Sequence, residues 1–249
     1  MIQEHINRQT LGNLNKTTKI RLLIMKITFV VPILLSFILM PFSHAQTSNN
    51  VINSPSVTML DEYTIKGDVN FYSGISPGDE QGNINVVVEI PKGSTGKWEV
   101  DKSNGTIIWE HKKGKPRTVS YLGGYPANYG SVPRTALTKE FGGDGDPLDV
   151  VIVGDVIPRG EVVKIKLIGI INLIEGEGEF DGKLLGVRVG TPHANVSDFH
   201  ELNSKFDGMG DTVVKWFTSY KGPGEITLQN IGSSEEAMEI VNISAAAFE

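Results

Sequence analysis

The stretch GGDGDPLDVVIV, residues 142–153, places three aspartates directly before an apolar run. Asp144, Asp146 and Asp149 are separated only by glycine, proline and leucine. Carboxylates this close repel one another, so their local fold is costly at neutral pH unless cations lie among them, and hard oxygen ligands favour Mg2+ or Mn2+. The β-branched run at 150–153 predicts a buried strand. The stretch therefore indicates either a metal site at the start of a strand or a solvated acidic turn, since Asp and Gly are also the commonest residues of turns.

Two further acidic segments adjoin predicted strands. Glu89 lies near the end of INVVVEI, residues 84–90, where it faces either solvent or a polar site. The segment EGEGEFDGK, residues 175–183, carries four acids and a closing lysine. A loop of this composition is usually solvated, but an apolar run follows it at 184–189, as one follows the first acidic stretch. This repeated arrangement favours convergence of the two acidic stretches on shared metal ions.

The apolar patterns predict a chain that is mainly β, with α-helices towards its end. Strands are predicted at 84–90, 97–100, 106–109, 150–156, 162–173 and 184–189. A short turn at 198–202 precedes a helix at 211–220 with Asp211 as its N-cap, and a last helix at 233–248 begins with the capping box SSEE. Short strands followed by helices predict a small closed barrel with helices packed outside.

Two loops carry side chains suited to binding anions. The basic segment HKKGKPR, residues 111–117, is typical of a solvated hairpin tip. The segment YPANYG, residues 125–130, is predicted as a loop because it is rich in Gly and Pro. Its two tyrosines either fill the edge of the core or donate their hydroxyls to an anion.

Composition places the chain among globular proteins and limits its chemistry. The 249 residues are 39% hydrophobic and 21% charged, which suits one domain with a sizeable core. The absence of cysteine excludes disulfides, thiolate catalysis and zinc–sulfur sites. The net charge is −6, and five of the 23 basic residues but only one of the 29 acids lie in the first 45 positions, so the remainder carries −10. That balance argues against nucleic acid as a partner.

The amino-terminal 45 residues predict a secretory signal peptide. Residues 27–42 are almost wholly apolar, a lysine precedes them, and small residues place cleavage after Ala45. A retained membrane anchor is the alternative, but sixteen residues with two prolines are short for a span of about 20 residues. We therefore expect an exported protein, periplasmic or secreted, that is not retained in the membrane. Translation is expected to start at Met25, residues 46–70 to form a flexible leader, and residues 71–249 to form the domain.

In combination, these motifs resemble the soluble inorganic pyrophosphatases of family I, which are built on a five-stranded OB-like barrel. The resemblance runs from about Tyr72 to the carboxyl end. It rests on five segments in the order that the family shows: VEIPKGSTGKWEVD (88–101), YPANYG (125–130), DGDPLD (144–149), DGK (181–183) and YK (220–221). Each segment alone is weak, but chance assembly of all five is negligible.

The resemblance implies metal-dependent hydrolysis of inorganic pyrophosphate to two orthophosphates, with Mg2+ as cofactor, Mn2+ or another divalent ion as a substitute, and a homo-oligomer, either dimer or hexamer. The implied metal ligands are Asp144, Asp149, Asp181, Glu177 and, through water, Glu89. Asp146 resembles the general base that acts on the attacking water, with Arg117 and Lys183 beside it in catalysis. The implied phosphate-contacting set is Lys97, Arg117, Tyr125, Tyr129, Lys183, Tyr220 and Lys221, supported by Glu99.

One position departs from the family pattern. Family members carry an Asp-Glu pair before the last ligand aspartate, and counting back from Asp181 places Gly176 and Glu177 there. The aspartate is missing, so we expect a weaker metal site unless Glu175 takes its place. Two other classes compete with an enzyme: an OB-type module that binds phosphate or metal without turnover, and an OB-fold nucleic-acid binder, which the negative charge disfavours.

Overall fold

The computed structural model describes residues 55–139, 143 and 145–248. The predicted signal peptide, the start at Met25 and the first metal-ligand candidate, Asp144, lie outside the described residues. Among the residues that are described, no helix is long and apolar enough to cross a membrane.

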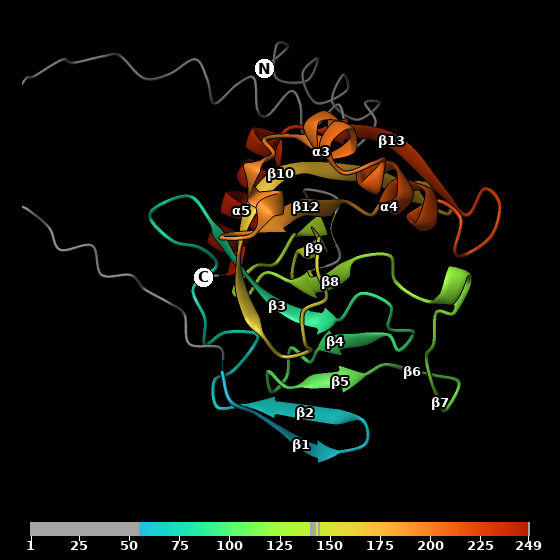
Figure 1. Ribbon diagram of the computed structural model, residues 1–249. Coiled ribbons are helices and arrows are strands. Elements are labelled where there is room, and N and C mark those ends of the chain that lie inside the picture. Colours follow the sequence, from blue (N-terminus) through green and yellow to red (C-terminus); the bar gives the residue numbers. More distant parts are fainter. Residues whose placement is uncertain (1–54, 140–142, 144, 249) are drawn as a thin grey trace, which may run out of the picture. The chain divides into compact units, whose positions relative to one another are not determined.

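Five strands close into a ring, as predicted. They are β3 (Ile84–Ile90), β8 (Asn128–Ser131), β9 (Asp149–Val153), β10 (Val162–Glu175) and β12 (Lys183–Arg188). The order around the ring is β3-β8-β9-β12-β10, and β10 pairs back onto β3. β9 and β12 are parallel, and the other four pairings are antiparallel. The mainly β, OB-like barrel with flanking helices is therefore confirmed (Figure 1).

The barrel strands are apolar on both faces because two cores lie against them. Every residue of β3 is buried, and its apolar side chains divide between two separate clusters. Val87 and Ile90 join the cluster that contains Trp216, whereas Val86 and Val88 join the one that contains Ile240. A run of β-branched residues without polar alternation is the pattern expected of a strand buried in this way.

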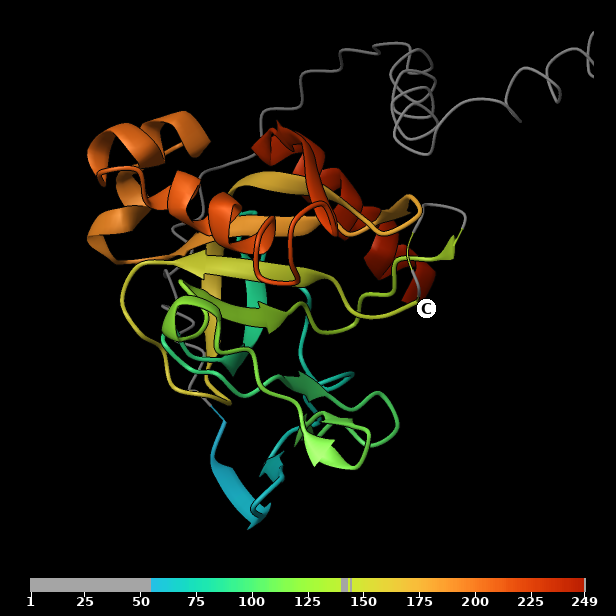
Figure 2. The ribbon, with the colours of Figure 1, turned by 90° about the vertical axis from the view of Figure 1, so that its right-hand side faces the viewer.

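Three helices gather at one end of the barrel (Figures 1 and 2). They are α3 (Phe199–Lys205), α4 (Met209–Phe217) and α5 (Ser234–Phe248). The last helix was predicted almost to the residue. The prediction of Asp211 as an N-cap was wrong: α4 begins two residues earlier behind Gly208, whose φ of 71° is left-handed, and Asp211 lies in the first turn, where a negative charge favours the helix dipole.

A second sheet lies at the opposite end of the barrel (Figures 1 and 2). Its order is β1-β2-β5-β4, from β1 (Val57–Asp61), β2 (Thr64–Gly67), β5 (Ile107–Trp109) and β4 (Trp98–Val100). The structure thus differs from the flexible leader predicted through residue 70. β2 pairs with β5 and buries Ile65, so part of that segment belongs to the fold.

Short elements complete the described chain. They are the hairpin β6 (His111–Lys112) and β7 (Lys115–Pro116), β11 (Glu179–Phe180), β13 (Ile226–Gly232), and the 3-10 helices η1 (Tyr121–Gly123) and η3 (Pro192–Asn195). β13 pairs with β10, whose Gly169 passes close to its backbone: a Cβ on Gly169 would meet the carbonyl oxygen of Gly232 at 2.7 Å. Only glycine allows this approach.

Candidate active site

The two acidic stretches meet at one edge of the barrel. β9 begins at Asp149 and β12 begins at Lys183, and parallel neighbours begin at the same edge of a sheet. The Nζ of Lys183 lies 2.5 Å from Oδ2 of Asp149 and 2.5 Å from Oδ1 of Asp181. The structure therefore brings together one acid from each predicted stretch, with an ammonium group between them.

The charges in this group stabilise one another. The side chain of Lys183 is 7% exposed, and burial disfavours its charge, yet attraction by Asp149 and Asp181 outweighs burial and raises the pKa of Lys183. Burial also disfavours the charge of Asp149, which would raise the pKa of this carboxyl. The attraction of Lys183 and Lys97 outweighs burial and holds the pKa below its usual value. Lys183 and Asp149 thus stay ionised together at neutral pH. Two carboxylates that hold an ammonium in this way have the oxygen donors and the charge to hold a divalent cation.

Glu89 points into the protein and not to solvent. It is 3% exposed and accepts hydrogen bonds from the backbone N of Val100, at 2.9 Å, and from Oγ of Ser131, at 2.7 Å. Burial raises the pKa of Glu89 to about 7, against the opposing attraction of Lys97. Of the two interpretations of this acid, the structure selects the polar interior site.

The segment predicted as a tyrosine-bearing loop is partly a strand. Tyr125 and Tyr129 are both almost fully buried, and Tyr129 belongs to β8. The Nζ atoms of Lys97 and Lys183 lie 5.5 and 5.7 Å from the centre of the Tyr129 ring. Burial raises the pKa of both tyrosines, so their hydroxyls remain protonated donors. The first suggested role is thus confirmed, because both rings fill the core edge, and donation of their hydroxyls to an anion stays a prediction.

An aromatic residue that sequence reasoning missed supports these tyrosines. Trp216 on α4 lies 4.8 Å from the ring of Tyr125 and is stacked on Tyr220 at 4.7 Å, with the planes 8° apart. Its indole nitrogen donates to the backbone oxygen of Tyr121. The four-residue spacing of Trp216 and Tyr220 on one helical face was the available signal.

Arg117 is held by a partner that sequence reasoning also missed. Its Nη1 lies 3.0 and 2.7 Å from the two carboxylate oxygens of Glu110. Burial lowers the pKa of Arg117, but this ion pair outweighs it and raises the pKa. Nearby, Nζ of Lys97 lies 3.6 Å from the carboxylate of Glu99, the predicted supporting acid.

Asp146 lies at the surface of the protein. Its carboxylate forms an ion pair with Lys102, which the sequence analysis did not select, and 57% of its side chain is exposed. Lys102 also approaches the backbone oxygen of Gly145 at 3.4 Å. Below this segment, the backbone N of Leu148 donates to Oγ1 of Thr135 at 3.0 Å. The predicted base is therefore accessible to water on an anchored turn.

Comparison with known proteins places this site in a family. The family model described as "Inorganic pyrophosphatase" matches residues 86–249, about two thirds of the chain. The chain belongs to the inorganic pyrophosphatase family.

Individual pyrophosphatases agree with this assignment. The chain is 32% identical over 176 residues to the mitochondrial inorganic pyrophosphatase of Saccharomyces cerevisiae, covering 64% of this chain and 56% of that one. It is 37% identical over 154 residues to the inorganic pyrophosphatase of Bos taurus, covering 56% and 53%. The chain thus spans about half the length of these curated relatives. The solved inorganic pyrophosphatase of Schistosoma japonicum superposes with a TM-score of 0.67 at 27% identity, covering 72% and 71%.

The departure from the pyrophosphatase pattern lies in a turn. Gly176 has a φ of 52° and open space where a Cβ would lie, and it connects β10 to β11. The carboxylate of Glu175, the suggested replacement ligand, forms an ion pair with Lys221, and its ligand role stays a prediction. Glu177 is exposed in the same turn. Within the described ranges, which omit Asp144, no three acidic or histidine side chains are grouped to hold a metal ion, so all the predicted ligand roles stay predictions.

Proposed function

We propose that this chain hydrolyses inorganic pyrophosphate to two orthophosphates with the help of divalent metal ions, Mg2+ in the first place. One observation carries the proposal: in a chain of this family, two carboxylates and a buried lysine converge beside the ring of Tyr129 at the edge of the barrel. Carboxylates suit hard cations, and lysine, arginine and tyrosine donors suit phosphate oxygens. The site therefore has ligands for the metal ions and hydrogen-bond donors for the pyrophosphate anion.

The cation-binding part of the site is formed by Asp149 and Asp181, joined in our proposal by Asp144, Glu177 and Glu89. Divalent ions, when bound there, would supply charge neutralisation and lower the pKa of a water. Burial raises the pKa of Glu89 to about 7. A cation bound nearby would lower this pKa and favour the ionised carboxylate.

The remaining residues bind and orient the anion. Glu110 holds Arg117 through one terminal nitrogen, and no hydrogen bond joins the other to a residue that the structure describes, so Arg117 can donate to phosphate in a fixed orientation. The hydroxyls of Tyr125 and Tyr129 donate without adding charge. Asp146, exposed at the surface, accepts a proton from the attacking water as the bond from phosphorus to the bridging oxygen breaks and orthophosphate leaves.

Phosphate release from pyrophosphate by the purified full chain tests the proposal. With Mg2+ we expect turnover, with EDTA we expect none, and Asp181→Asn should abolish most of it because the variant keeps the shape but loses the charge that faces Lys183. Release that persists in EDTA would contradict the proposal. Binding of Mg2+ and pyrophosphate without release would favour the non-catalytic module, with Gly176 as the natural cause.

We further propose that the protein is exported and acts as a homo-oligomer. Export is supported by the apolar run at 27–42 with small residues before the expected cleavage point, and a role outside the cytoplasm would be the recovery of phosphate from external pyrophosphate. Mass spectrometry of the protein from its host should find Gln46 as the first residue. An intact amino terminus at Met1 or Met25 would contradict cleavage. Sedimentation equilibrium distinguishes a monomer from a dimer or hexamer.

A further inference from the structure

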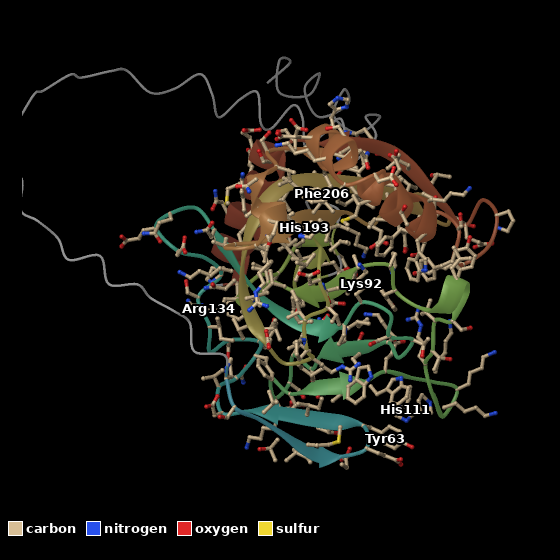
Figure 3. The ribbon with its side chains drawn as sticks, viewed as in Figure 1. Tyr63, Lys92, His111, Arg134, His193 and Phe206 are labelled. Atoms are coloured by element: carbon tan, nitrogen blue, oxygen red, sulfur yellow. The ribbon has the colours of Figure 1, made fainter. Side chains whose placement is uncertain are left out.

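The β6–β7 hairpin concentrates positive charge on its exposed two-residue turn and on the strand residues that flank the turn. Lys112, Lys113 and Lys115 are all exposed, and within the part of the chain that the structure describes none of them forms an ion pair with a carboxylate. The hairpin projects beside β5 and β4 in Figure 1, and Figure 3 labels His111 at its base, next to Tyr63.

This arrangement is unfavourable for the hairpin by itself. Lys112 lies directly opposite Lys115 in the antiparallel pairing, and like charges in directly opposite positions destabilise a sheet. Lys113 and Gly114 have φ values of 56° and 74°, and a turn with two left-handed residues prefers asparagine or glycine to lysine at its first position. The three ammonium groups therefore repel one another on an exposed hairpin, and a bound anion would offset that repulsion more directly than solvent and salt do.

The hairpin is continuous with the phosphate-binding part of the proposed site. Its neck is closed by backbone hydrogen bonds from Arg117 N to Glu110 O, at 2.7 Å, and from Lys97 N to Arg117 O, at 2.9 Å. Alternate residues of a strand share a face, and so do residues directly opposite each other. Arg117 therefore shares a face with Lys115, and Lys115 with Lys112. At about 3.3 Å per residue, Lys115 lies roughly 7 Å along the chain from Arg117.

We propose that the hairpin face bearing Lys112 and Lys115 is an outer anion subsite for linear condensed phosphates longer than pyrophosphate. The proposal rests on the proposed function, in which Arg117 contacts a phosphate at the inner end of this face. Tripolyphosphate, the shortest such chain, extends its third phosphate outward from Arg117 to the two lysines. Water adds across its terminal anhydride bond, the proton goes to Asp146, and orthophosphate and pyrophosphate leave.

Two anions and matched lysine variants distinguish this subsite from general attraction. Lys112→Gln, Lys115→Gln and the double variant are compared with Lys66→Gln, which removes an exposed lysine of β2. The measured quantities are KM for pyrophosphate, and KM or competitive Ki for tripolyphosphate, at low and high salt. We expect the KM or Ki for tripolyphosphate to rise about ten-fold in the double variant, because charge-assisted contacts are lost. The KM for pyrophosphate should change less than about two-fold. Lys66→Gln should change neither value.

Either of two results would overturn the subsite. If the binding of both anions weakens equally at low salt and neither changes at high salt, the hairpin's charge acts only by long-range steering. Unchanged affinity for tripolyphosphate would mean that the lysines only face solvent. Thermal unfolding checks the fold, and the double variant should be at least as stable as the wild type because it loses a repulsion.

Failure of the subsite and failure of the proposed function give different results. A wild-type chain that does not cleave pyrophosphate refutes the function. Titration calorimetry of tripolyphosphate with Mg2+ against wild type and double variant then still decides the subsite, because it needs no turnover. Equal dissociation constants for the two proteins would refute it.

Discussion

Replacing Lys183 by methionine should make the stability of the protein depend on divalent metal. The variant keeps the length of the side chain but removes the ammonium that lies 2.5 Å from both Asp149 and Asp181. The two carboxylates then lack the ammonium that lies between them, and of the two lysines that lower the pKa of Asp149 only Lys97 remains. Removing one partner of a buried ion pair costs about 3–5 kcal/mol. The two aspartates are 32% and 28% exposed, so water relieves part of this cost, and we expect a loss of about 2–3 kcal/mol in EDTA.

Urea unfolding followed by tryptophan fluorescence, in EDTA and in Mg2+, measures this effect. We expect Mg2+ to restore most of the free energy of unfolding that Lys183→Met loses, and to stabilise the variant more than the wild type. Lys164→Met is the matched control: it breaks an ion pair of 2.8 Å with Asp79, away from the two site carboxylates, so Mg2+ should not repair it. A variant as stable as the wild type in EDTA, or an equal gain from Mg2+ in both, would refute the reasoning.

Three other predictions follow from the contacts. Glu110→Gln keeps the size of the side chain but weakens its ion pair with Arg117, so KM for pyrophosphate should rise several-fold with a smaller effect on kcat. Glu110→Asp keeps the charge and should restore part of the lost affinity. An unchanged KM would refute the positioning role of Glu110. Hydrogen bonds from Ser103 hold the pKa of Asp101 below its usual value, so their stabilisation is present above about pH 4 and is lost as pH falls through the lowered pKa. Stability curves measured against pH should therefore be flatter in acid for Asp101→Asn. Ile152 is fully buried in β9, so Ile152→Ala should lower the free energy of unfolding in urea by about 2–5 kcal/mol. A loss below about 1 kcal/mol would contradict its place in the core.

The barrel was predictable because its strands carry a strong local signal. The runs at 84–90 and 150–153 are apolar on both faces, and burial on both sides is what such runs indicate. β8 was missed because its segment contains Gly and Pro and reads as a loop, yet all four residues are buried between β3 and β9. β1 was missed because it is a fully exposed strand of five residues, whose apolar Val57, Met59 and Leu60 do not mark a buried face.

The candidate site was predictable only where the chemistry lies in the motif itself. Asp149, Asp181 and Lys183 belong to short acidic stretches, and the apolar run beside each stretch favoured their convergence, which the parallel pairing of β9 and β12 brings about. Glu110 was not predictable, because its pairing with Arg117 depends on the register of a hairpin six residues long. The pairing of Lys102 with the acidic stretch depends on a contact across 44 positions, for which one sequence holds no signal.

Phosphate release by the wild type and by Asp146→Asn, at equal concentrations of folded protein in Mg2+, tests the proposed hydrolysis most directly. Asparagine keeps the size of the side chain but cannot take a proton from water, and a general base contributes about 10²–10⁴-fold to the rate. We therefore expect kcat for pyrophosphate to fall at least about 100-fold while pyrophosphate still binds. A variant that turns over pyrophosphate at the rate of the wild type would contradict the assignment of Asp146 as the base, and a wild type that releases no phosphate would contradict the proposed activity.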